Sequence, residues 1–179
     1  MGLLNPGWLT DLIDRIRRRN LSAPEKSLDS YEKGIQAVAN GKPALAIKHF
    51  TNAISMTPDS SKLYHHRADA FARNGQYNEA IVDFDVAVRL EPTYPDTYLD
   101  RGNTHYAAGQ LDDAIKDFSE AIRLKPEWAE AYANRAVARM ERGDEAESEQ
   151  DAATARTLGV DQVRLNEMLH DARTSPESD

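Results

Sequence analysis

The feature of this sequence that most constrains its fold is a repeat of 34 residues. Proline recurs at this spacing as Pro58, Pro92 and Pro126. Other columns keep the same register, with glycine at 41, 75, 109 and 143, alanine at 46, 80 and 114 and again at 53, 87, 121 and 155, and phenylalanine at 50, 84 and 118. The repeat predicts four units, which cover residues 27–60, 61–94, 95–128 and 129–162.

Each unit is expected to form a pair of α-helices. Two stretches of about 13 residues flank each repeated glycine, and each repeated proline follows the second stretch, where a helix must end. In the third unit Ala114, Phe118, Ala121 and Leu124 are three or four positions apart and form one apolar helix face. A single hairpin cannot bury that face, so the units must stack on one another. The prediction is an all-α, right-handed superhelical solenoid of helix-turn-helix repeats.

At these positions, over residues 27–162, the sequence resembles the tetratricopeptide repeat family. The early aromatic position of the family unit is held by Tyr64, Tyr98 and Tyr132, and the first small position by Gly34, Ala68, Gly102 and Ala136. The end units depart from the pattern, with Ser30 in the first and Glu145, Ser148, Ala152 and Val160 in the fourth. The resemblance implies that a peptide or helix of another protein binds in the groove lined by the first helix of each unit.

Arginine and aspartate also recur together. Arg67, Arg101 and Arg135 each precede an aspartate of the same unit by 16 residues, namely Asp83, Asp117 and Asp151. The first unit has Lys33 and His49 at these two places, so both residue types are lost at once. We expect each pair to bridge the two helices of its own hairpin; pairing between adjacent hairpins would instead place Arg67 opposite His49.

Helical spacing selects one face of each first helix, opposite the Ala and Phe stripe, as the candidate partner groove. Acidic residues outnumber basic ones on this face, so the expected partner is a protein or peptide with a basic or amphipathic segment. Asn103 and Asn134 would bond the partner backbone, and Leu99, Tyr106, Val137 and Met140 would supply apolar contacts. The alternative is that these acids are only solvated surface. The candidate residues are His65, His66, Asp69, Asp96, Leu99, Asp100, Asn103, Tyr106, Glu130, Asn134, Val137 and Met140.

A subclass of the family binds the acidic C-termini of heat-shock chaperones through lysine, asparagine and arginine at fixed groove positions. In this sequence the corresponding positions hold Tyr31, Ile35, His66, Asp96 and Asp100 in one frame of the repeat, and His65, Asp69, Asp100, Glu130 and Asn134 in the other. A carboxylate beside Asp96 or Asp100 would be repelled. The sequence therefore disfavours this kind of partner.

Residues 1–22 are predicted to form an amphipathic helix and a linker. Its apolar arc consists of Trp8, Leu9, Leu12, Ile13 and Ile16. Three roles remain open: a cap on the apolar stripe of the first unit (Leu28, Tyr31, Ile35, Val38), a docking helix for another protein or a second copy, and a membrane-surface helix aided by arginines at 15 and 17–19. Ser22 and Glu25 have capping-box spacing, so the first repeat helix should begin near Ala23.

The chain is thus divided into residues 1–22, four repeats within 23–162, and a C-terminal part at 163–179. Val163, Leu165, Met168 and Leu169 predict a final helix within 160–172 that covers the fourth unit. Residues 174–179 are expected to form a loose tail.

Composition excludes several function classes. The net charge of −8 disfavours binding to nucleic acid, and no apolar run is long enough to span a membrane. There is no cysteine, no phosphate-binding loop and no nucleophile motif, and only His65 and Asp69 have a metal-ligand spacing on one helix. We expect no metal, no cofactor, no enzymatic activity and no signal peptide, and a cytoplasmic location. The predicted function is a protein-interaction scaffold or adaptor; the alternative is an assembly or membrane-recruitment protein that acts through its N-terminal helix.

Overall fold

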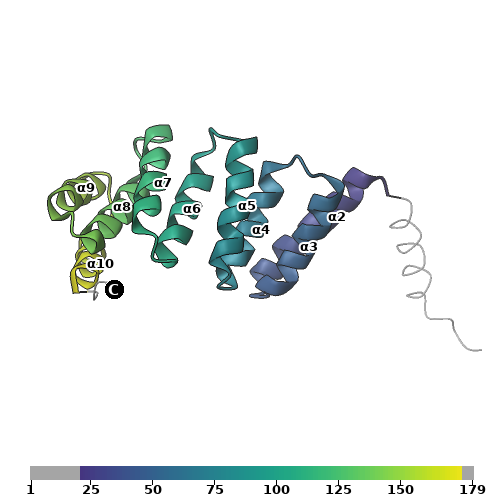
Figure 1. Ribbon diagram of the computed structural model, residues 1–179, viewed down its shortest axis with the longest axis horizontal. Coiled ribbons are helices and arrows are strands. Elements are labelled where there is room, and N and C mark those ends of the chain that lie inside the picture. The colour runs from purple at the N-terminus through teal and green to yellow at the C-terminus, as the bar shows by residue number, and fades with distance from the viewer. Residues whose placement is uncertain (1–20, 175–179) are drawn as a thin grey trace, which may run out of the picture.

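The computed structural model describes residues 21–174, which form nine α-helices and no strand. Figure 1 shows that the helices follow one another in chain order as a row of hairpins, which confirms the all-α solenoid. The hairpins are α2 (Ala23–Ala39) with α3 (Pro43–Met56), α4 (Ser61–Arg73) with α5 (Tyr77–Leu90), α6 (Pro95–Ala107) with α7 (Leu111–Leu124), and α8 (Ala129–Arg142) with α9 (Glu145–Thr157). One further helix, α10 (Gln162–Thr174), ends the row.

The repeated columns account for the packing inside each hairpin. The phenylalanines Phe50, Phe84 and Phe118 are almost fully buried, together with the alanines one turn before them. The first small position lets the two helices approach closely, because a Cβ added at Gly102 would lie 2.7 Å from Phe118 Cε1. The turn glycines at 41, 75, 109 and 143 have φ of +66° to +91°, a conformation that other residues rarely adopt.

The predicted bridges between arginine and aspartate are present in all three hairpins. Nε and Nη2 of Arg101 donate to the two carboxylate oxygens of Asp117, at 2.8 and 2.7 Å, and the other two hairpins have the same two-pronged contact. The pairing within a hairpin is therefore confirmed. A two-pronged contact of this kind fixes the orientation of both side chains.

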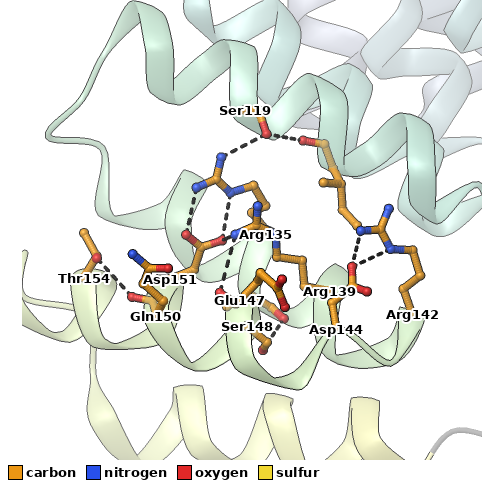
Figure 2. A network of polar contacts seen from close by, with 12 residues as sticks. Ser119, Arg135, Arg139, Arg142, Asp144, Glu147, Ser148, Gln150, Asp151 and Thr154 are labelled. Carbon is orange, nitrogen blue, oxygen red and sulfur yellow. Dashed lines mark hydrogen bonds and ion pairs between the residues drawn. The ribbon is translucent and has the colours of Figure 1, made fainter.

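Each of these arginines also reaches the preceding hairpin through Nη1. The acceptors are Thr51 for Arg67 at 3.1 Å, Asp85 for Arg101 at 2.6 Å and Ser119 for Arg135 at 2.9 Å. Figure 2 shows the last of these arrangements, in which Arg139 adds a second contact to Asp151 at 2.6 Å. One guanidinium thus joins three helices. The contact with the preceding hairpin is not the alternative pairing, which would place Arg67 opposite His49, because the acceptor is Thr51, two residues later.

The two ends of the described array differ. The backbone N–H of Ser22 donates to the Glu25 carboxylate at 2.8 Å, and α2 begins at Ala23, where the capping box predicts it. At the other end Leu165 and Leu169 of α10 are buried against the fourth hairpin. The predicted amphipathic helix with Trp8, Leu9, Leu12, Ile13 and Ile16 lies outside the described residues, as does most of the tail.

Candidate partner groove

The first helices of the four hairpins supply the candidate partner groove. Helices α4 and α6 contact each other, as do α6 and α8, so their first-helix faces form one continuous surface. A recess of about 310 Å³ lies between α4 and α6, and Asp69, Asp100 and Asn103 line it. A second recess of about 320 Å³ lies between α8 and α10, beside Glu130 and Asn134. The first recess is lined by residues of two neighbouring hairpins, so stacking of the units creates it, and the second is completed by α10.

Polar side chains bond across this surface from one helix to the next. The Tyr31 hydroxyl and His66 Nε2 are 3.1 Å apart, and His65 Nε2 lies 3.3 Å from an Asp100 oxygen. Farther along, Asn134 Nδ2 donates to the side-chain oxygen Oδ1 of Asn103 at 2.8 Å. These contacts hold the candidate residues in place before any partner binds.

Three candidate residues are not available to a partner. Leu99, Val137 and Met140 were expected to offer apolar contacts in the groove, but their exposed fractions are only 4%, 7% and 5%. Leu99 is packed with residues of α6, α7 and α8, whereas Val137 and Met140 lie in one cluster with Leu165 and Leu169. The prediction was wrong for the last two because α10 covers the same face of α8 that is open on α4 and α6.

Tyr106 is the remaining apolar candidate, and it is only partly buried. Its hydroxyl donates to the Glu141 carboxylate at 2.5 Å. Burial and this carboxylate raise the pKa of Tyr106 above its usual range, so the phenol stays neutral. The ring packs against two core clusters, and the polar end of the side chain is satisfied by Glu141.

The acidic candidates differ in how far they are neutralised. Asp69 accepts from Arg73 Nε at 2.8 and 2.9 Å, and Asp100 has His65 as a neighbour. Asp96 and Glu130 make no hydrogen bond or ion pair with any residue in the part of the chain that the structure describes. Within residues 21–174, two carboxylates of this surface therefore lack an ion-pair partner.

His66 is the most perturbed base of the groove. Its ring stacks on Phe50 with centroids 5.9 Å apart, and burial, together with the nearby His65 and Lys62, lowers its pKa to about 4. His66 is consequently neutral near pH 7 and does not add positive charge to the groove.

Comparison with known proteins identifies the repeat. A family model described as TPR repeat matches residues 68–109 and 102–143, and a second, described as tetratricopeptide repeat, matches residues 49–82. Together these matches run from residue 49 to residue 143, more than half of the chain. The chain belongs to the tetratricopeptide repeat family. As a tetratricopeptide repeat protein it has the fold of a protein-interaction scaffold, and such proteins are generally non-catalytic.

Solved structures have the same architecture as this tetratricopeptide repeat protein. MamA matches with a TM-score of 0.75 and 20% identity over 84% of this chain and 86% of that one. The first TPR of Spaghetti (RPAP3), bound to an HSP90 peptide, matches with a TM-score of 0.59 and 28% identity over 73% and 95%. The Thermus thermophilus protein TTC0263 gives 0.66 and 19% over 82% and 80%. No curated protein sequence matches significantly.

Two further features of residues 21–174 concern membranes and metal ions. Among residues 21–174 no helix is both long and apolar enough to cross a membrane. Within the same residues no group of three or more histidine, aspartate or glutamate side chains is placed to hold a metal ion.

Some residues that shape the surface lie between repeats and were not predicted from the sequence. Glu91 and Tyr94, in the segment that joins α5 to α6, line a pocket beside His65 and His66. The one sequence pattern that could have indicated this pocket is an aromatic residue at the end of two units, Tyr94 in the second and Trp128 in the third. Thr51, Asp85 and Ser119 were missed as the second acceptors of the arginines, although they also form a column of polar residues.

Proposed function

We propose that this tetratricopeptide repeat protein is an adaptor that holds a basic or amphipathic segment of a partner protein on the face of α4, α6 and the N-terminal half of α8. The observation that carries the proposal is that Asp96 and Glu130 have no hydrogen-bond or ion-pair partner within residues 21–174, and that Asp100, one turn after Asp96 on α6, is partly exposed. Cationic side chains of a partner would complete these sites and would also be steered toward them.

An acidic partner fits this face less well. Two solved structures hold peptides with acidic C-terminal sequences, SRMEEVD on the first TPR of Spaghetti and SGPTIEEVD on the second TPR domain of human RPAP3. In the present chain a peptide carboxylate would meet Asp96 and Asp100, and two like charges about 4 Å apart repel by about 4 kcal/mol at an effective dielectric constant of 20. A basic segment reverses the sign of the same interaction.

The test is capture of partners from the native cell extract with a charge-reversed bait. Asp96→Lys with Glu130→Lys should abolish capture of the specific partners that wild type retains. The matched control is Glu147→Lys with Glu167→Lys, which makes the same change in net charge at exposed positions of α9 and α10. Glu147 and Glu130 both lie in the first turn of a helix, so the effect on the helix dipole is matched for this pair. Asp96 lies in the first turn of α6 but Glu167 in the middle of α10, so the helicity of each bait measures the remaining difference. Equal helicity of all baits is checked first. Retention of the same partners by the Asp96 and Glu130 variant would refute groove binding.

A second candidate function is self-association or membrane recruitment through residues 1–22. It is favoured by α2, on which Leu28 and Ile35 are 56% and 37% exposed. We infer that the apolar residues Trp8, Leu9, Leu12, Ile13 and Ile16 would then act on a second copy or on a lipid surface. Light scattering over a range of concentrations, with and without residues 1–22, tests the first version, and liposome flotation tests the second. A constant monomer mass and no flotation would exclude both.

A further inference from the structure

One pocket beside the groove has a more closed form than the two recesses described above. It has a volume of about 260 Å³ and lies where the start of α4, the segment between α5 and α6, and the start of α6 meet. Its walls include His65, His66, Tyr94 and Glu91. The size suits a single side chain of a partner rather than a stretch of backbone.

Three rings form the walls of this pocket. The His65 ring stands nearly perpendicular to the rings of His66 and Tyr94, with centroids 5.5 and 6.0 Å away. His65 is held from both nitrogens, since Nδ1 is 3.1 Å from Thr97 Oγ1 and Nε2 is 3.3 Å from Asp100. The pocket therefore presents a fixed arrangement of aromatic surfaces.

The charge around these rings is negative. Glu91 is exposed and uses one carboxylate oxygen to accept the Ser61 hydroxyl at 2.7 Å, which leaves its other oxygen available. Burial of the phenol, followed by the carboxylates of Asp96, Glu91 and Asp100, raises the pKa of Tyr94. Lys62 lines the pocket together with Glu91 and opposes these carboxylates, and its ammonium group lies 4.6 Å from the Tyr31 ring. The lining itself therefore holds one carboxylate and one ammonium group, and Asp96 and Asp100, which lie outside the lining, make the wider surroundings acidic.

We infer that this pocket binds an arginine side chain of the basic partner segment, an inference that rests on the proposed function. A guanidinium is planar and weakly hydrated, so it can lie against an aromatic face and still donate to a carboxylate such as Glu91. Lysine carries the same charge but hydrates strongly and lacks a flat surface to stack. Arginine and lysine peptides of equal charge therefore separate the pocket from the general attraction of the groove.

The experiment measures the binding of four nine-residue peptides to the full chain by fluorescence anisotropy. Each peptide has the same lysine-containing glycine and serine background and a central guest residue, which is arginine, lysine, glutamine or phenylalanine. Wild type should bind the arginine peptide roughly five- to tenfold more tightly than the lysine peptide. Tyr94→Ala and Glu91→Gln should each bring this ratio to about one, with little change for the lysine peptide. Both sites are exposed, so the variants should fold normally.

Tyr77→Ala is the matched control, because Tyr77 is an exposed aromatic residue of the neighbouring recess and lies outside the pocket. It should keep the full preference for arginine. A preference that survives Tyr94→Ala and Glu91→Gln would overturn the pocket assignment, and tighter binding of the phenylalanine peptide would overturn the choice of arginine. The proposed function fails separately, if Asp96→Lys with Glu130→Lys leaves the lysine peptide bound as before. Absence of binding for all cationic peptides would overturn both.

Discussion

Removal of a single carboxylate from the centre of the array should reveal how the hairpins are held together. Arg101 donates to Asp117 inside its hairpin and to Asp85 in the preceding one, so a single guanidinium has two aspartates with different surroundings. The Asp117 side chain is 8% exposed and the Asp85 side chain 53%. Replacing each aspartate by asparagine changes the same charge in a buried and in an exposed place.

The magnitudes follow from this difference in burial. Burial disfavours the charged guanidinium, but Asp117 and Asp85 more than offset it and raise the pKa of Arg101. When Asp117 is lost the arginine stays charged, because a guanidinium does not deprotonate in proteins, and it keeps only the exposed contact with Asp85. Breaking a buried ion pair in this way costs about 3 kcal/mol or more. Asp117 also lies 3.7 Å from His105 Nε2, which adds to the loss when His105 is protonated. Loss of the exposed contact in Asp85→Asn should cost about 1 kcal/mol or less.

The assay is urea unfolding followed by far-UV circular dichroism, on wild type, Asp85→Asn, Asp117→Asn, Arg101→Gln and the double variant Asp117→Asn with Arg101→Gln. Arg101→Gln removes the charge that Asp117→Asn leaves without its buried carboxylate partner. The double variant should therefore be about 2 kcal/mol more stable than expected from the sum of the two single losses. Unchanged slopes with urea would confirm that the variants unfold by the same cooperative transition. Additivity within about 0.5 kcal/mol, or an Asp85→Asn loss as large as that of Asp117→Asn, would refute the reasoning.

Three further changes probe other parts of the molecule. His66 has a pKa of about 4 in the folded chain against an ordinary value of 6.5, so its contribution to stability is complete above pH 6.5 and is lost as the pH falls toward 4. After allowance for partial exposure, His66→Asn should remove about 2 kcal/mol of this loss. Unfolding curves of both proteins at pH 7 and 4.5 measure the difference. The pH-dependent difference tests this, because Lys62, His65, Asp69 and Asp100, which also act on His66, stay in both proteins. Gly102→Ala should destabilise the fold by about 1 to 3 kcal/mol, because its Cβ would overlap the Phe118 ring. In a chain that already carries Phe118→Leu, Gly102→Ala should cost less stability. Additive losses from the two substitutions would contradict the contact. Leu165→Ala should cost about 2 to 5 kcal/mol and increase binding of a hydrophobic dye, because it opens the cluster that holds Val137; a loss below about 1 kcal/mol would show that α10 is not a cap.

The fold could be predicted because each repeated residue has a geometric role that recurs in every unit. Pro92 ends a helix, Gly75 takes the left-handed turn, and Phe84 fills the space beside the small position. The pairing of arginine with aspartate could be predicted for the same reason, since the two residues are gained and lost together across units. A residue that acts within its own unit leaves a periodic signal.

The candidate site was predicted less well because its shape depends on contacts between units. Val137 of α8 holds the same position in its unit as Asn103 of α6, so spacing alone treats them as equal. They differ because α10 lies over α8, and α10 is outside the repeat. The pocket at Glu91 and Tyr94 was missed for a related reason, since a connecting segment completes it rather than a helix face.

If a partner segment binds as proposed, coverage of α8 by α10 also limits where that segment can end. The side chains of α8 that remain near the surface on this face, Glu130 and Asn134, belong to its N-terminal half, and the rest of the face is the buried cluster with Met140. A segment that follows the groove from the pocket at Tyr94 therefore crosses α6 at Asp100 and Asn103 and reaches α8 near Asn134. In the proposed complex its cationic residues would lie at the two ends and its backbone contacts in the middle, where Asn103 and Asn134 already bond each other. That hydrogen bond must open or be shared before either asparagine can bind a partner backbone. In the proposed complex the two charged ends of the partner segment would therefore supply most of the favourable electrostatic free energy. The asparagines would serve mainly to set the register of the segment.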